Sequence, residues 1–339
     1  MVMAPALIDQ FGRTATNLRV SLTDRCSLRC LYCMPADATW LPRQSLLTEA
    51  EFLRLITIAV RDLGVRDVRF TGGEPLMFKG ATHLIAATNS LPTPPNTALT
   101  TNGLTLARHA ASLRAAGLAR LNVSLDTLDP ARYARITGSP RLGDVVAGLA
   151  AAKDAGFAPI KIDTVLLRGI NDDEAVTLTR WAIAHDYQLR FIEQMPLGPK
   201  DFWHRDEMIT ADEILDKLSA ELDLTPEPAS QRGSAPAETW IVAGADAPEG
   251  TTPTVGVIGS VTRPFCEACN RTRLTADGHI RNCLFAESET DIRTLLRSGA
   301  DDQALAQAWA AAMWTKQPGH KIDDSTFVQP ARPMRAIGG

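Results

Sequence analysis

The chain has 339 residues, of which 45% are hydrophobic and 22% charged, as in an ordinary globular protein with one large domain or two smaller ones. Its formal net charge of -4 argues against a general nucleic-acid binder, which usually carries a basic excess. The sequence contains neither an apolar run of about 18 residues nor the basic and apolar regions of a secretory signal. We therefore expect a cytoplasmic protein that works without a membrane and without nucleic acid.

Hydrophobic runs and helical patterns alternate along the first two thirds of the chain. Six segments read as strands: 18–22, 65–70, 97–101, 119–125, 160–167 and 188–194. Helical spacing follows a capping box formed by Thr48 and Glu51, and it recurs in 106–116, 144–155 and 173–185. Strands that alternate with helices predict parallel pairing, with the helices outside.

Polar residues gather where these strands end, and they decide between two α/β folds. Cysteines follow the first strand, and further polar motifs end four later ones: TGGEP (71–75), TTNG (100–103), SLD (124–126) and EQMP (193–196). An open doubly wound sheet uses mainly its switch point, whereas a barrel brings all these strand ends to one mouth. We expect an incomplete (βα)6 TIM-like barrel over residues 1–225.

The pattern changes after about residue 225. Segment 225–238 is rich in Pro, Ser, Ala and Gly and reads as a linker or an exposed loop, and 291–314 is helical. Short strands and more cysteines lie between them. We expect residues 226–339 to form a second domain that closes the barrel.

The six cysteines form two sets of three. The first set is Cys26, Cys30 and Cys33, spaced C-x3-C-x2-C, and the second is Cys266, Cys269 and Cys283, spaced C-x2-C-x13-C. Clustered cysteines in a cytosolic protein bind metal more often than they form disulfides. Three thiolates on a four-iron cluster leave one iron free for a substrate. The alternatives are a zinc knuckle that lacks one ligand for the first set, and for the second a zinc site completed by His279.

The first set resembles the signature of the radical S-adenosylmethionine (SAM) superfamily, in which Tyr32 precedes the third cysteine. Gly72, Gly73 and Glu74 are similar to the strand end that contacts SAM in that superfamily, where glycine lets the backbone come close to the ligand. The resemblance implies a 4Fe–4S cluster whose open iron chelates SAM. It also implies cleavage of SAM to methionine and a 5′-deoxyadenosyl radical.

The second set narrows the resemblance. With the motif PFCEACNRTRL (264–274) and the final Gly338 and Gly339, it resembles the GTP-cyclising radical SAM enzymes that begin molybdenum cofactor biosynthesis. This resemblance implies a second 4Fe–4S cluster that holds guanine. It implies a lyase that removes hydrogen from the 3′ carbon of GTP and forms (8S)-3′,8-cyclo-7,8-dihydroguanosine 5′-triphosphate. It further implies an electron donor such as flavodoxin or ferredoxin, product transfer to a pyranopterin monophosphate synthase, and a monomer or homodimer.

The site residues of that family carry over only where this sequence matches. The implied SAM contacts are Tyr32, Gly73, Ser124 and Met195. The implied GTP contacts are Arg19, Arg69, Thr100, Lys161, Arg271, Thr272 and Arg273. The implied catalytic tail is Gly338 and Gly339.

The residues themselves also favour an anionic substrate. The chain has no GK dipeptide and so no phosphate-binding loop of the Walker type, which leaves side chains to neutralise a triphosphate. Arg19, Arg69 and Lys161 lie on separate predicted strands, where their charge inside a barrel would be costly unless it were paired. The alternative is structural ion pairing with Asp24, Asp126 and Asp163.

Two other functions fit parts of this pattern. A radical SAM peptide-modifying enzyme with an auxiliary cluster usually has more C-terminal cysteines than the three found here. A non-catalytic metal-binding or electron-transfer protein would need neither the GGEP motif nor polar strand ends at a barrel mouth.

Overall fold

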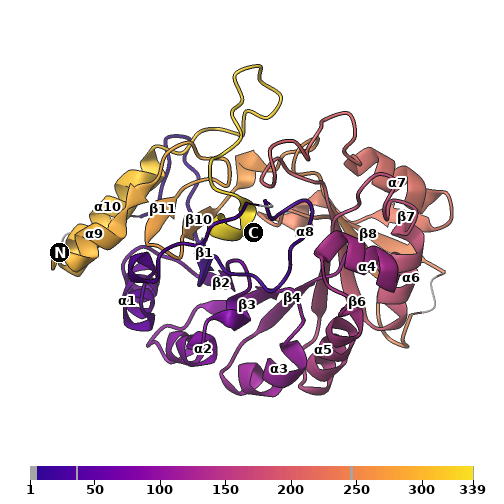
Figure 1. Ribbon diagram of the computed structural model, residues 1–339, viewed down its shortest axis with the longest axis horizontal. Helices are drawn as coiled ribbons and strands as arrows, with labels where there is room; N and C mark the ends of the chain where they lie inside the picture. Colours follow the sequence, from indigo (N-terminus) through magenta and orange to yellow (C-terminus); the bar gives the residue numbers. More distant parts are fainter. Residues whose placement is uncertain (1–5, 36, 245–246, 339) are drawn as a thin grey trace.

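The computed structural model describes residues 6–35, 37–244 and 247–338, and one large curved sheet dominates it (Figure 1). Within these residues the sheet has twelve strands in the order β12-β11-β10-β1-β2-β3-β4-β5-β6-β9-β8-β7. Its parallel centre consists of β1 (Asn17–Ser21), β2 (Asp67–Thr71), β3 (Asn96–Thr101), β4 (Arg120–Ser124), β5 (Ile160–Thr164) and β6 (Tyr187–Ile192). The two ends of this order are not hydrogen-bonded to each other in the described part, so the predicted incomplete barrel is confirmed.

Helices cover the outer side of the parallel strands (Figure 1). They are α1 (Glu49–Arg61), α2 (Ala81–Asn89), α3 (Leu106–Ala115), α4 (Pro130–Thr137), α5 (Leu142–Asp154), α6 (Ala175–Ala184) and α7 (Ala211–Ser219). The capping box predicted at Thr48 and Glu51 is confirmed, and it begins α1. Helices α2 and α4 were not predicted, because each is short and its apolar positions show no long repeat.

The last third of the chain extends the same sheet at both edges. Strand β9 (Thr254–Ile258) pairs parallel to β6, and β8 (Glu238–Ala243) and β7 (Asp223–Pro226) follow it in antiparallel order. At the other edge β10 (Arg271–Leu274) pairs parallel to β1, followed by β11 (His279–Arg281) and β12 (Thr290–Asp291). These strands continue the barrel sheet, and the division at residue 225 stays a prediction.

Two expectations for this third need correction. Segment 225–238 is no simple loop, since it contains the end of β7, the short helix α8 (Ala229–Arg232) and the start of β8. Segment 291–314 forms two helices, α9 (Ile292–Arg297) and α10 (Asp302–Trp314), separated by Gly299 at φ 88°. A left-handed backbone at this glycine ends the first helix. None of the described helices is both long and apolar enough to cross a bilayer.

Candidate active site

The first cysteine set lies on the loop that follows β1. The backbone amides of Cys33 and Met34 both donate to the carbonyl of Cys30, at 3.0 and 2.9 Å, which turns the loop tightly around this residue. Burial raises the pKa of all three thiols, to about 12 for Cys33, and neighbouring thiols raise those of Cys30 and Cys33 further. Thiols with raised pKa values become thiolates only beside a positive charge, which the irons of a bound cluster would supply.

The GGE segment after β2 packs directly against this loop. The amides of Gly73 and Glu74 donate to the carbonyls of Thr23 and Arg25, each at 2.7 Å. A side chain on Gly73 would collide with the backbone of Asp24 and Arg25, so only glycine permits this approach.

Glu74 links the segment to the next strand end. Its buried carboxylate accepts hydrogen bonds from the Thr101 hydroxyl and the Asn102 amide, each at 2.7 Å. The Asn102 side chain in turn lies 3.7 Å from the Cys26 sulfur. Sequence reasoning gave Asn102 no role, although its position in the TTNG motif marked it as a polar strand end.

The four predicted SAM contacts come from four different segments. The Tyr32 hydroxyl donates to Asp126 at 2.8 Å, and burial raises the pKa of that carboxyl to about 6. Gly73 ends the segment described above, and Ser124 is the last residue of β4. Met195, in the loop after β6, is the member of the four that lines the main cavity in the described part of the chain.

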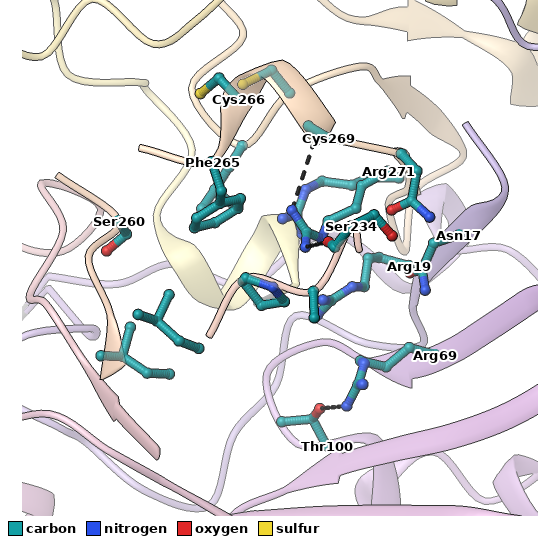
Figure 2. A pocket seen from close by; sticks show the side chains of 18 of the residues that line it. Asn17, Arg19, Arg69, Thr100, Ser234, Ser260, Phe265, Cys266, Cys269 and Arg271 are labelled. Carbon is teal, nitrogen blue, oxygen red and sulfur yellow. Dashed lines mark hydrogen bonds between the residues drawn. The ribbon is translucent and has the colours of Figure 1, made fainter. Parts of the chain in front are cut away.

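A cavity of about 420 Å³ opens inside the curve of the sheet (Figure 2). Six of the seven predicted GTP contacts line it: Arg19, Arg69, Thr100, Lys161, Arg271 and Arg273. All three cysteines of the second set line it too. The side chain of Thr272 turns away, because its hydroxyl accepts a hydrogen bond from the buried Trp309 indole at 2.9 Å. Alternation along β10 accounts for this, since it sends Arg271 and Arg273 to one side and Thr272 to the other.

The charge of the cavity is strongly positive. Burial, followed by repulsion from neighbouring cations, lowers the pKa of Lys161 to about 8 and that of Arg273 to about 10. Burial and Arg190 likewise bring the pKa of Arg69 to about 10, against a partial opposing effect of Asp163. These shifts mean that the cations lie out of water and close together, which an anionic ligand would relieve.

Sequence reasoning missed three further cations that line this cavity. Arg120 pairs with Asp67 at 2.9 Å and Arg190 with Asp163 at 2.6 Å, and Arg232 pairs with Glu238 at 2.9 Å. For Arg120 and Arg190 the signal was available, because both lie on predicted strands whose inward positions face the barrel interior. Arg232 lies in the segment that was read as a loop.

The alternative of structural ion pairs is not supported for Arg69 and Lys161. Asp163 is engaged with Arg190, Asp24 pairs with Arg335 at 3.4 Å, and Asp126 accepts from Tyr32. Within the described residues neither Arg69 nor Lys161 has a carboxylate within 4.0 Å of its charged nitrogens. Arg69 instead donates to the Thr100 hydroxyl at 3.2 Å (Figure 2).

The second cysteine set lies in a more cationic environment than the first. The Lys316 ammonium lies 3.3 Å from the Cys269 sulfur, and an Arg271 nitrogen lies 3.7 Å from it (Figure 2). Burial alone would raise the pKa of Cys269, but these two cations outweigh it and bring the value down to about 7. A thiol that ionises near neutral pH is well suited to bind iron.

His279 does not lie with the second cysteine set. Among the described residues no group of three or more His, Cys, Asp or Glu side chains is placed as the ligands of one metal ion. His279 lies 3.3 Å from the Asp277 carboxylate and is not among the described residues that line the cavity, so the zinc alternative is not supported.

The C-terminal segment enters the space enclosed by the strands (Figure 1). It forms a short helix, α11 (Met334–Ile337), and the Ile337 side chain is fully buried. The Ile337 carbonyl accepts from the Ser21 hydroxyl at 2.8 Å, and the Gly338 carbonyl accepts from Arg273. Gly338 has φ 79°, and a side chain there would collide with Ser21 and Thr71. Gly339 lies outside the described residues.

Comparisons with known proteins agree with this geometry. Residues 20–182 match the family model of the Radical SAM superfamily, and residues 187–322 match that of Molybdenum Cofactor Synthesis C. A GTP 3′,8-cyclase of Streptomyces coelicolor is 55% identical over 337 residues, which cover 99% of this chain and 97% of the relative. One of Mycolicibacterium smegmatis is 56% identical over 340 residues, covering 99% and 93%.

A solved structure shares the fold. Streptococcus suis SuiB bound to S-adenosylmethionine superposes with a TM-score of 0.58 at 15% identity, covering 85% of this chain and 66% of that one. At this identity the likeness bears on the fold alone, so it does not separate peptide-modifying enzymes from nucleotide cyclases. The near full-length relatives make that distinction.

Proposed function

The chain belongs to the GTP 3′,8-cyclase family of the radical SAM superfamily. We propose which of its residues serve each part of the conversion of GTP to (8S)-3′,8-cyclo-7,8-dihydroguanosine 5′-triphosphate. One observation supports this assignment of roles. The same cavity is lined by the second cysteine set and by a group of buried cations. Arg69 and Lys161, in that group, have no carboxylate partner among the described residues.

Cys26, Cys30 and Cys33 would hold the first 4Fe–4S cluster, and Tyr32, Gly73, Ser124 and Met195 would hold SAM beside it. When bound, this pair supplies the 5′-deoxyadenosyl radical that removes hydrogen from the 3′ carbon of the ribose. The chain's own part is to exclude water and to fix the loop. Gly73 does so through its close backbone approach, and Asn102 through its contact with the Cys26 sulfur.

Cys266, Cys269 and Cys283 would hold a second 4Fe–4S cluster, whose open iron would bind the guanine base. Arg19, Arg69 and Lys161 would neutralise the triphosphate, and Thr100 orients Arg69 through their hydrogen bond. Arg271 and Arg273 lie on β10, beside β1, and line the same cavity as the second cysteine set, where they would contact the nucleotide. Guanidinium groups suit this task because each can donate two parallel hydrogen bonds to phosphate. Thr272, whose side chain points elsewhere, would act through its backbone.

Gly338 and Gly339 would form a catalytic tail that shapes the reaction space. A residue without a side chain can occupy a narrow lumen at positive φ, as Gly338 does here. Its carbonyl accepts a hydrogen bond from Arg273, which links the tail to the proposed substrate contacts.

The reaction also needs partners. We propose a flavodoxin or ferredoxin as electron donor, transfer of the product to a pyranopterin monophosphate synthase, and a cytoplasmic monomer or homodimer. The electron donor is proposed because the cluster needs one-electron reduction, and the synthase because the cyclised triphosphate needs an enzyme that consumes it.

The test is an anaerobic turnover assay with SAM, dithionite and GTP carrying deuterium at the 3′ carbon. We expect one deuterium in the 5′-deoxyadenosine formed, together with the cyclised triphosphate. Metal analysis of the same preparation should find iron and no stoichiometric zinc. Cleavage of SAM that neither depends on GTP nor acquires deuterium would contradict the proposed function.

A further inference from the structure

Arg335 is a buried arginine three residues before Gly338, and a buried charge of this kind needs an explanation. Its side chain is 7% exposed, and the neighbouring Ile337 is fully buried. Burying a guanidinium costs free energy unless its nitrogens are paired. Arginine at this position therefore indicates a specific anchoring contact.

Three groups form the binding site for this guanidinium, and we call them the Arg335 socket: Asp24, Thr39 and Trp40. One terminal nitrogen donates to the Asp24 carbonyl at 3.2 Å and lies 3.4 Å from its carboxylate. The other donates to the Thr39 carbonyl at 2.7 Å. The guanidinium carbon lies 4.7 Å from the centre of the Trp40 ring, within the range of a cation–π contact.

The Arg335 socket is built on the loop that carries the first cysteine set. Asp24 precedes Cys26 by two residues, and its carboxylate also accepts from the Leu41 amide at 2.7 Å, which ties the segment with Trp40 to that loop. Arg29, between Cys26 and Cys30, lies 5.2 Å from the same Trp40 ring. The socket and the first cysteine set therefore share one piece of backbone.

The tail continues from Arg335 to the proposed reaction space. The Ser21 hydroxyl holds the Ile337 carbonyl, and Arg273 holds that of Gly338. Both contacts fix only carbonyl oxygens. The buried Ile337 side chain and the Met334 amide, which donates to the Leu197 carbonyl at 2.8 Å, also hold the segment. Among the described contacts of this segment, the Arg335 socket is the one that ties a charged side chain to the loop of the first cysteine set.

We propose that Arg335 is a positioning residue. Its contacts with the Arg335 socket fix the position of Gly338 relative to the first cysteine set. This inference rests on the proposed catalytic role of the tail. Arg335 is not among the described residues that line the substrate cavity, and its backbone amide and charge both act on the Cys33 thiol. It would therefore act by coupling the tail to the loop where SAM would be held.

The first measurement needs no cluster and no activity. Carboxypeptidase digestion followed by mass spectrometry reports whether the tail leaves its buried site. We expect Arg335→Ala to release residues beyond 334 at least about tenfold faster than the unchanged chain, because local opening controls such cleavage. A tail that stays equally protected in this variant would overturn the proposal.

The second measurement counts 5′-deoxyadenosine and cyclised product separately. We expect Arg335→Ala to lower the product formed per turnover by about 100-fold, the typical cost of misplacing a group by about 1 Å. The KM for GTP should change little, because the Arg335 socket does not line the substrate cavity in the described chain. Arg335→Lys keeps the charge beside Asp24 but loses the second nitrogen that donates to the Thr39 carbonyl. This variant should therefore form more product than Arg335→Ala.

Two variants guard against trivial explanations. Arg335→Met combined with Asp24→Asn removes both charges, so it should fold without an unpaired buried carboxylate and still lose product. Arg332→Ala is the matched control on the same segment, because Arg332 pairs with Asp277 at 2.8 Å and lies farther from Gly338. We expect it to keep most product formation.

The outcomes separate the inference from the proposed function. If Arg335→Ala frees the tail while product is unchanged, the catalytic role of the tail fails and the positioning role fails with it. If Arg332→Ala and Arg335→Ala lose equal amounts of product, then any loosening of the C-terminal segment has the same effect. That outcome would rule out a specific positioning role for the Arg335 socket. Loss of product with a freed tail, unchanged KM and partial rescue by lysine supports the proposal.

Discussion

The two cysteine sets have the same ligand count, but the charged groups around Cys269 differ from those around the first set. Burial raises the pKa of Cys26 and Cys30, and the carboxylates of Glu74 and Asp126, respectively, raise them further. In the second set Lys316 and Arg271 outweigh burial and bring the pKa of Cys269 to about 7. Three cysteines therefore do not define a site by themselves. The charged neighbours differ, since carboxylates lie near Cys26 and Cys30 whereas Lys316 and Arg271 lie near Cys269. We infer that these neighbours suit the first set to SAM, which carries a cationic sulfonium, and the second to the nucleotide that the cationic cavity would hold.

The largest effects should come from removing the thiols. Replacing Cys26, Cys30 or Cys33 by Ser should abolish reductive SAM cleavage, because a serine hydroxyl is a much poorer iron ligand than a thiolate. Replacing Cys266, Cys269 or Cys283 should leave uncoupled SAM cleavage but no cyclised nucleotide. Anaerobic assay of 5′-deoxyadenosine and product measures both. If the variants of Cys266, Cys269 or Cys283 cyclise GTP at the normal rate, the second cysteine set has only a structural role.

The next effect concerns the C-terminal tail, which contacts Ser21 and Arg273. Gly338→Ala should lower formation of the cyclised triphosphate by about 100-fold, because the added carbon collides with Ser21 and Thr71 at a positive φ. Gly339→Ala tests the neighbouring position. Global fold and SAM binding should persist, and circular dichroism with SAM titration checks this. An unchanged single-turnover rate in a variant lacking both glycines would show that the tail has no catalytic role.

A smaller effect tests the cationic cavity. Arg69→Ala should weaken GTP binding by about 10- to 100-fold, which corresponds to the roughly 1.5–3 kcal/mol of one charge-assisted hydrogen bond. SAM binding at the first cysteine set should change little. Equilibrium dialysis with both ligands gives the two affinities, and Arg61→Ala at the surface is the control. If the Arg69→Ala protein folds and binds GTP as tightly as the unchanged protein, Arg69 does not contact the phosphates.

The smallest effect is a pH dependence confined to the GTP site. Burial lowers the pKa of Lys161 to about 8, so its ammonium is fully charged only below that pH. GTP affinity should therefore be highest below about pH 8 and fall as pH rises above it. The fall should stop above the pKa that Lys161 has when GTP is bound. Lys161→Arg should flatten this profile, because arginine stays charged. A profile that is identical in the two proteins would assign the titration to another group.

Much of the barrel could be predicted because its signals are local. Each central strand is an apolar run followed by a helix, and the capping box at Thr48 and Glu51 needs only four residues. The pairing of β10 with β1 could not be predicted, since it joins Leu18 to Thr272 across most of the chain and leaves no local pattern. For the same reason the continuation of one sheet through the last third was not expected.

The candidate site shows the same limit. The cysteines and the arginines of PFCEACNRTRL were found from short motifs. Alternation along β10 puts Arg271 and Arg273 on one side and the side chain of Thr272 on the other, which the expected GTP contact at Thr272 did not take into account. The partners of Arg190 and Arg335 come from distant segments, and the contacts of a buried arginine depend on packing that no single stretch of sequence contains.

The register of three neighbouring strands has a consequence for the lifetime of the protein. Arg19 lies directly beside Arg273 on one side and Arg69 on the other, so three guanidinium side chains are arranged in a row. Their mutual repulsion disfavours the folded chain, and a bound polyanion removes it. A ligand at 100 times its dissociation constant adds about 2.7 kcal/mol to the free energy of unfolding. We therefore expect the cellular supply of guanine nucleotide to determine how much of this protein escapes proteolysis, as well as how fast it works.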